Sequence, residues 1–122
     1  MGLPFQHKVI RWCKTAFGEK DAADKRMRAL RFIEEALELG QATGLTRAEA
    51  QRVLDYVYDR PIGEIPQEIG GTMVALASLV GAYGLGMYTC GENELIRCWQ
   101  KIEVIRQRHA AKPKFDGTDT RP

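Results

Sequence analysis

The sequence of 122 residues predicts an all-α fold, organised as a four- to five-helix bundle. No segment alternates apolar and polar residues as a half-buried strand does, and no Asn-Gly or Asp-Gly turn joins two β-branched runs. Helix start and stop signals instead divide the chain into five segments. The length suits one domain, since domains usually span about 100–200 residues.

Glycines delimit the first two predicted helices. A short helix is expected over residues 7–16 and ends at Phe17-Gly18, and a long helix over residues 22–43 is closed by Gly44. Glycine favours helix C-termini because it adopts the left-handed backbone conformation without a steric cost.

A capping pattern opens the third predicted helix. Thr46 stands three residues before Glu49, which is the spacing of a capping box. This helix is expected to run to about Tyr58 and to stop before Arg60-Pro61.

The second half of the chain predicts two further helices and a tail. Residues 67–82 are expected to be helical, and their apolar side chains on every side predict a central, buried helix that ends in the glycine-rich run 83–86. The fifth helix is expected over residues 92–110. The polar tail 113–122 contains proline and glycine and is expected to be flexible, so the single domain should span residues 1–112.

Charge is segregated along the chain although the net charge is only +2. Residues 1–31 carry eight basic and three acidic side chains, whereas residues 32–68 carry three basic and eight acidic side chains. So small a net charge is no basic footprint, so we expect no nucleic-acid partner. The acidic segment 32–68 instead raises the question whether its carboxylates bind a metal ion and whether the flanking basic residues bind phosphate.

Cysteine and hydropathy patterns indicate a reducing compartment. The cysteines are Cys13, Cys90 and Cys98, and the histidines are His7 and His109. An odd number of cysteines without a CxxC pair fits neither a disulfide framework nor a zinc site.

The most apolar stretch, residues 73–87, is shorter than the roughly 20 residues of a membrane span. We therefore expect no membrane partner and a cytoplasmic location, which means the host cytoplasm if the gene is viral.

Three carboxylates share one side of the long helix. At 100° per residue, Glu34, Glu35 and Glu38 fall in one sector with Arg28 and Arg31, and this sector borders the apolar stripe. Like charges one turn apart repel, so a partly desolvated cluster either protonates or binds a cation. The alternative is a surface cluster whose carboxylates pair with the two arginines.

A second acidic element opens the helix at 67–82. Glu68 lies in its first turn, where the helix dipole favours a negative charge, so this residue could be a simple capping carboxylate. Gly70 and Gly71 follow inside the helix, where each costs roughly 1 kcal/mol relative to alanine. Something is expected to approach the backbone there, either another helix or a ligand.

These two elements resemble the MazG-like all-α nucleoside triphosphate pyrophosphohydrolases. That family pairs an EExxE pattern on one helix with ExxD on the next; here the patterns are Glu34-Glu35-Ala-Leu-Glu38 and Glu68-Ile-Gly-Gly71. The resemblance covers Trp12 to Lys112. It is closest to a bacterial and phage-borne branch that includes the MazZ-type dATP/dGTP diphosphohydrolases.

The resemblance implies hydrolysis of a (d)NTP, with (d)GTP preferred, to the monophosphate and pyrophosphate. It implies Mg²⁺ or Mn²⁺ held by Glu35, Glu38 and Glu68, with Glu34 next, and a water that attacks the α-phosphorus. Any of Glu34, Glu35 and Glu38 could hold that water as the catalytic base. The long helix and the helix at 67–82 should lie side by side.

The family pattern has Asp where this chain has Gly71. Either the site has fewer protein ligands, or the metal arrangement has shifted, or activity is lost. Asp55 or Asp59 could substitute in space. Two other functions therefore stay open: a non-catalytic helical interaction protein derived from the enzymes, and a nucleic-acid-associated regulator that uses the basic N-terminal segment.

Basic side chains are expected near a bound triphosphate. Lys101 is the first candidate and Arg31 the second, followed by Arg28 and Arg106; the alternative for each is a surface salt bridge. Trp12 could stack on a purine or anchor the first helix in the core. Trp99 and Tyr88 are expected in the core.

The apolar helix at 67–82 also predicts self-association. A chain of this size cannot easily cover such a helix on every side. We therefore expect a homodimer or homotetramer with active sites close to subunit interfaces.

Overall fold

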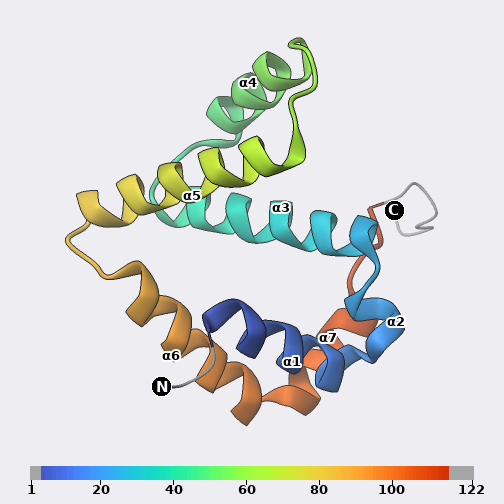
Figure 1. Cartoon of the computed structure of the whole chain (residues 1–122). Coiled ribbons are helices and arrows are strands. Elements are labelled where there is room, and N and C mark those ends of the chain that lie inside the picture. The colour runs from blue at the N-terminus through green and yellow to red at the C-terminus, as the bar shows by residue number, and fades with distance from the viewer. Residues whose placement is uncertain (1–3, 116–122) are drawn as a thin grey trace. The chain divides into compact units, whose positions relative to one another are not determined.

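The computed structural model describes residues 4–115, which form seven helices and no strand (Figure 1). The all-α prediction is therefore confirmed for this part of the chain. The helices are α1 (Phe5–Phe17), α2 (Glu19–Ala22), α3 (Lys25–Ala42), α4 (Arg47–Tyr58), α5 (Ile65–Ala82), α6 (Met87–Gln100) and α7 (Ile102–Ala111). The predicted flexible tail lies outside the described residues from position 116 onward.

The chain divides into two compact units. One contains the described residues up to Ile33 together with those from Gly91 onward, and the other is Glu34–Cys90. The boundaries fall inside α3 and α6, so each of these helices contributes residues to both units.

The first unit has a small core in which α1 lies against α2 and α7 (Figure 1). Its buried residues are Trp12 and Ala16 from α1 and Leu95 from α6. Seven partly buried side chains surround them: Phe5, Val9, Cys13, Phe17, Cys98, Ile102 and Ile105. On α1 these positions recur every three or four residues, which places them on one face of the helix.

A close approach in this unit explains one glycine. A Cβ added at Gly91 would lie 2.9 Å from Cζ of Phe5, a distance shorter than any ordinary carbon contact. Glycine at position 91 therefore allows the Phe5 ring to sit directly over the backbone of α6.

Two predicted helices have other bounds in the structure, and one of them is divided in two. The long helix over 22–43 begins only at Lys25, because Asp24 Oδ1 accepts a hydrogen bond from the backbone N–H of Met27 at 3.0 Å and caps α3. The helix over 92–110 begins earlier, at Met87, and is interrupted at Lys101, where the backbone leaves helical geometry with φ −116° and ψ 28°.

The predicted stop and start signals of the second unit are confirmed. Gly44 has φ +96°, and Leu45 N donates to Gly40 O at 3.0 Å, which is the Schellman closure of α3. Thr46 and Glu49 then form both hydrogen bonds of the capping box that begins α4. The same closure recurs at Gly84, where α5 ends.

The second unit contains no buried residue between Glu34 and Cys90. Large apolar side chains of α4 and α5 are more than half exposed, among them Tyr58, Ile69, Met73 and Val74. The prediction that α5 is buried is therefore wrong for a single chain, because no element of this unit covers it. An apolar surface of this extent is typical of an interaction site.

No single helix among the described residues is long and apolar enough to cross a membrane, although α5 and α6 taken together as a bent pair have the length and composition.

Candidate functional site

The four carboxylates of the sequence pattern lie in one compact unit. Glu34, Glu35 and Glu38 lie in α3, just after the point where the second unit begins. Glu68 lies in the first turn of α5. Glu34 is half-buried, whereas the other three are exposed. Of the three carboxylates on α3, Glu34 is therefore the one that borders the apolar side of the helix.

The Glu68 side chain folds back toward the loop before α5. A Cβ added at Gly63 would lie 3.0 Å from its Oε1 atom, so glycine leaves room for this carboxylate. Thr72 Oγ1 donates to the backbone oxygen of Glu68 at 2.8 Å. In contrast, nothing within 4 Å would meet a Cβ at Gly70 or Gly71, so both glycines present open backbone.

The chemistry of this donor set suits a hard cation, since Mg²⁺ and Mn²⁺ prefer carboxylate oxygens. The geometry is less complete. Within residues 4–115, no three His, Cys, Asp or Glu side chains are gathered closely enough to hold one metal ion. Glu34, Glu35 and Glu38 follow one another on one helix, and a metal site there would need other side-chain rotamers or further ligands.

The two indoles occupy opposite environments. Trp12 is 8% exposed, and its ring meets that of Phe17 edge-on at 5.3 Å between centroids. Trp12 is thus an anchor of the core, and its stacking on a purine stays a prediction. Trp99 and Tyr88 were expected in the core, but Trp99 is 40% exposed and Tyr88 is exposed as well.

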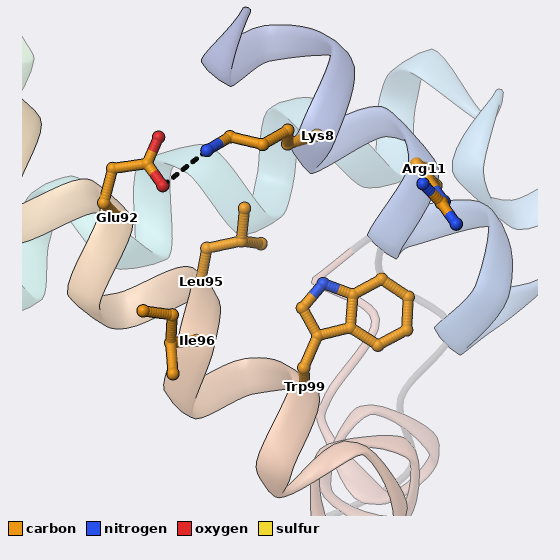
Figure 2. A pocket seen from close by; sticks show the side chains of 6 residues that line it. All are labelled: Lys8, Arg11, Glu92, Leu95, Ile96 and Trp99. Atoms are coloured by element: carbon orange, nitrogen blue, oxygen red, sulfur yellow. Dashed lines mark hydrogen bonds and ion pairs between the residues drawn. The ribbon is translucent and has the colours of Figure 1, made fainter. Parts of the chain in front are cut away.

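Trp99 lines a hollow between α1 and α6 of about 320 Å³. Figure 2 shows its lining: an ion pair at one end, the indole at the other and two aliphatic side chains between them. The lining residues are Lys8, Arg11, Glu92, Leu95, Ile96 and Trp99. The residues from α6 recur at positions i, i+3, i+4 and i+7, so they share one face of the helix that the sequence predicted over residues 92–110.

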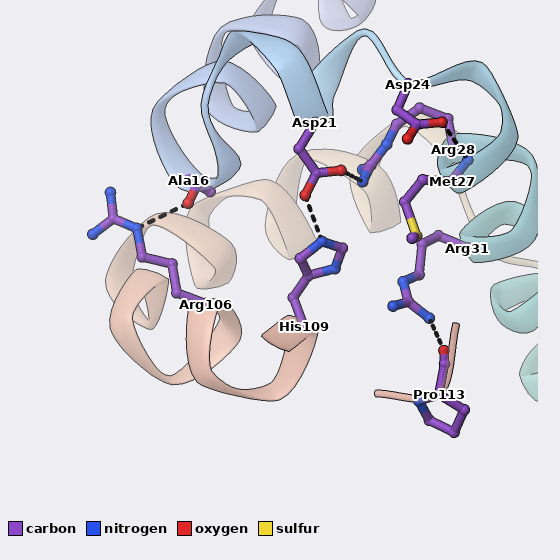
Figure 3. Close-up of polar contacts among 9 residues, drawn as sticks. All are labelled: Ala16, Asp21, Asp24, Met27, Arg28, Arg31, Arg106, His109 and Pro113. Carbon is purple, nitrogen blue, oxygen red and sulfur yellow. Dashed lines mark hydrogen bonds and ion pairs between the residues drawn. The ribbon is translucent and has the colours of Figure 1, made fainter. Parts of the chain in front are cut away.

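Arg28 and Arg31, predicted to contact phosphate, are engaged by protein groups in the first unit (Figure 3). Arg28 Nη2 lies 3.2 Å from Asp21 Oδ1, and its guanidinium lies over the Phe17 ring at 5.4 Å. Arg31 Nη1 donates to Pro113 O at 3.4 Å. Both arginines therefore connect α3 to neighbouring segments of its own unit.

Arg106 closes the C-terminal end of α1. Its Nε donates to Ala16 O at 2.9 Å (Figure 3). Its Nη2 donates to Thr15 O at 2.8 Å. The last carbonyls of a helix have no partner within the helix, so this guanidinium satisfies two of them. Lys101 is exposed at the start of α7.

A polar contact that sequence reasoning missed joins α2 to α7. His109 Nε2 lies 2.7 Å from Asp21 Oδ2 (Figure 3). The imidazole lies 4.3 Å from the Phe17 ring, centroid to centroid. Asp21 thus holds His109 with one oxygen and Arg28 with the other. Because 88 positions separate Asp21 from His109, no local pattern could reveal this pairing.

Burial and hydrogen bonds shift the pKa of side chains that lie outside the carboxylate pattern. Burial raises the pKa of the Cys13 thiol, an effect that the nearby Arg28 partly offsets. Hydrogen bonds from Thr46 lower the pKa of Glu49, and a hydrogen bond from Arg97 lowers the pKa of Glu94. None of these groups belongs to the carboxylate pattern.

Comparison with models of protein families, with curated proteins and with solved structures finds no match for this chain.

Proposed function

We propose that the chain is a metal-dependent (d)NTP pyrophosphohydrolase, with purine (d)GTP as the preferred substrate. The observation that carries the proposal is that Glu34, Glu35, Glu38 and Glu68 all belong to one compact unit. The resemblance of their spacing to the MazG-like pattern supplies the reaction class. Water and the triphosphate give the monophosphate and pyrophosphate, and the bond between the α-phosphorus and the bridging oxygen breaks.

The carboxylates divide into two roles in this proposal. Glu35, Glu38 and Glu68 are exposed and would hold Mg²⁺ or Mn²⁺. Glu34 is half-buried and would accept the proton of the attacking water. Its partial burial leaves fewer waters from the bulk solvent to compete for its carboxylate oxygens. The metal, when bound, neutralises phosphate charge and polarises the phosphoryl oxygens.

Lys101 is the best candidate for direct phosphate binding among the predicted cations. It is exposed, whereas Arg28, Arg31 and Arg106 already donate to protein oxygens. A role for these three arginines would require them to exchange their protein partners for phosphate.

We also propose that a second copy of the chain covers the unit Glu34–Cys90, in a homodimer or homotetramer. A small unit without a buried residue has little hydrophobic stabilisation of its own, and the exposed apolar side chains of α4 and α5 supply the missing contact surface. Such an interface lies beside the carboxylate helices, so the second copy could bring further ligands to the site.

A non-catalytic helical interaction protein is the second candidate function. Two observations favour it: Gly71 replaces the acidic residue of the family pattern, and acidic side chains are not gathered into a metal site within residues 4–115. A melting curve with and without Mg²⁺ separates the two candidates, since ligand binding to the folded state raises the melting temperature.

The decisive experiment incubates the purified chain with the eight common ribo- and deoxyribonucleotides in Mg²⁺ and in Mn²⁺ and identifies the products. Release of pyrophosphate with the monophosphate supports the proposal, whereas release of orthophosphate contradicts the reaction class. No product from any nucleotide supports the non-catalytic alternative.

Glu38→Gln tests the site itself. We expect pyrophosphate release to fall by about 100-fold or more, since removal of one charge-stabilising group typically costs that much. Glu94→Gln is the matched control, because Glu94 is an exposed helical glutamate that pairs with Arg97. Equal activity of Glu38→Gln and the control would contradict the assignment.

A further inference from the structure

The two compact units carry opposite net charges. The described part of the first unit, residues 4–33 and 91–115, has 14 lysine and arginine side chains against six aspartate and glutamate side chains, a net charge of +8. The unit Glu34–Cys90 has three basic against eight acidic side chains, a net charge of −5. We expected no nucleic-acid partner because the whole chain carries only +2, but that average does not describe the first unit.

The exposed face of α1 is basic. His7, Arg11 and Lys14 recur at positions i, i+4 and i+7, so they share one face of the helix, and all three are exposed. The opposite face carries Trp12 and Ala16, which are buried in the core. There is no acidic residue in α1, and within residues 4–115 neither Arg11 nor Lys14 forms a salt bridge. Their charges are therefore available to an anionic partner.

A partly exposed indole lies beside this basic face. Arg11 of α1 and Trp99 of α6 line the same hollow (Figure 2). Lys8 lines it too, but its charge is already paired with that of Glu92 at 2.6 Å. Arg11 also lines a second hollow, of about 380 Å³, with four other residues of α1: His7, Ile10, Lys14 and Thr15. Arg11 therefore connects the indole to the basic face of α1.

This combination suits a strand of unpaired nucleotides. Proteins that bind single-stranded nucleic acid without sequence preference combine cations along the phosphate backbone with aromatic side chains on which bases stack. Arg11 and Lys14 supply the cations, and Trp99 supplies the aromatic face. All three belong to the first unit, so the surface is complete within it.

Other polyanionic partners use these groups less completely. An amphipathic helix on a membrane buries its apolar face in the lipid, whereas the apolar face of α1 packs into the core of its own unit. A polyglutamate chain would pair with the cations of α1, but it has no ring to stack on Trp99. The indole therefore favours nucleic acid over both.

We propose that the exposed face of α1 and Trp99 together bind single-stranded nucleic acid, with Arg11 and Lys14 at phosphate groups and the indole stacked on a base. The surface selects no base, since every base offers a face to the indole. The proposal is independent of the proposed hydrolysis, because its ligand has no triphosphate and its surface includes none of the four carboxylates. Failure of either proposal leaves the other standing.

The test measures binding of a labelled oligo(dT) of about 12 nucleotides to the full chain by fluorescence anisotropy. Oligo(dT) contains no guanine, and EDTA in the buffer prevents metal-dependent hydrolysis. We expect a Kd between about 10⁻⁴ and 10⁻⁶ M at low salt. Because stacking needs unpaired bases, we expect the same strand in a duplex to bind about tenfold more weakly. Absence of binding at low salt, or equal affinity for the duplex, for polyglutamate or for anionic lipid vesicles, would overturn the proposal.

Arg11→Met and Lys14→Met test the phosphate contacts. Each should lower the affinity for oligo(dT) and reduce the slope of log K against log salt by about 0.7, the value for one phosphate contact on a single strand. Arg52→Met in α4 is the control, since Arg52 is an exposed arginine of the acidic unit. Circular dichroism checks that each variant is folded. If the folded α1 variants keep the salt slope of the parent chain, the assignment is wrong.

Trp99→Leu separates stacking from attraction between charges. It should lower the affinity by about tenfold or more and leave the salt slope unchanged. Unlabelled oligo(dT) should quench the indole fluorescence of the parent chain but not that of Trp99→Leu, whose remaining indole, Trp12, is buried. Tyr58→Leu is the control, because Tyr58 is an exposed aromatic residue of the other unit. If the folded Trp99→Leu variant binds as tightly as the parent chain, the surface attracts polyanions by charge alone and the proposal is refuted.

Discussion

Asp21 Oδ2 and His109 Nε2 are 2.7 Å apart, and this contact joins the four-residue helix α2 to the last helix of the chain. The other Asp21 oxygen faces Arg28 at 3.2 Å. A single carboxylate therefore connects α2 with both α3 and α7. In a unit with only three buried residues among those described, this connection should matter for stability.

Asp21→Ala should lower the free energy of unfolding by about 1–2 kcal/mol, because hydrogen bonds to charged groups contribute measurably even when partly exposed. Urea denaturation followed by circular dichroism measures the change. Glu19→Ala in the same short helix is the control and should change stability by less than about 0.5 kcal/mol. Equal effects of the two substitutions would show that the contact contributes nothing.

Arg106→Met separates a structural role from a phosphate-binding role. Because Arg106 donates to Thr15 O and Ala16 O, we expect a loss of about 1 kcal/mol in stability, since water can replace the guanidinium at the exposed Thr15 carbonyl. We expect little change in the KM for nucleotide at a temperature where the variant is folded. Arg108→Met on the same helix is the control. A large rise in KM without a loss of stability would restore the phosphate-binding assignment.

Local signals in the sequence predicted the helix ends well. Thr46 with Glu49, and the glycines at 18 and 44, end or begin helices through contacts with residues a few positions away, so their spacing in the sequence predicts them. At Lys101 no neighbouring glycine or proline marks the interruption of the helix. The contacts of Asp21 with His109 and of Arg106 with Thr15 join residues about 90 positions apart, and one sequence carries no record of such pairings.

In the candidate site too, the sequence predicted what local spacing determines and not what long-range packing determines. Spacing alone predicted that Glu34, Glu35 and Glu38 share one side of a helix. It could not reveal that Arg28 and Arg31 have protein partners, or that Trp99 is the more exposed indole. The hollow at Lys8 and Glu92 depends on how α1 meets α6, and that depends on packing at Gly91 rather than on any motif.

Thr46→Ala should destabilise α4 and remove part of the acid sensitivity of the chain. Hydrogen bonds from Thr46 lower the pKa of Glu49 in the folded state. The stability that comes from this shift is therefore present above the unfolded pKa of Glu49 and is lost as the pH falls through its folded pKa. Melting temperatures recorded between about pH 6 and pH 3 should fall less steeply for Thr46→Ala than for the parent chain.

Thr46→Ser is the control for this prediction, since serine keeps the hydroxyl acceptor. Loss of the cap should cost about 1 kcal/mol at neutral pH, and the serine variant should keep most of it. The backbone N–H of Thr46 donates to Glu49 in all three chains, so parallel pH profiles would contradict a contribution of the Thr46 hydroxyl to the lowered pKa of Glu49.

Cys13 should react more slowly with iodoacetamide than Cys90. Burial raises its pKa, so less of the nucleophilic thiolate is present near neutral pH. Cys90 is exposed and should react faster. Mass spectrometry of peptides after timed alkylation measures the order, and urea should abolish the difference. Faster alkylation of Cys13 than of Cys90 in the folded chain would contradict the burial described for α1.

The open glycines of α5 test whether a second copy covers this helix. In an isolated chain, Gly71→Ala should stabilise α5 by up to about 1 kcal/mol, because alanine favours helix and no described atom within 4 Å would meet its Cβ. If another copy packs closely there, the added methyl group should instead weaken self-association. We expect the second outcome, seen by light scattering as a shift toward monomer, and we expect Val74→Glu to produce a larger shift. Gly40→Ala in α3 is the control for helix propensity, and a monomeric parent chain would refute the interface outright.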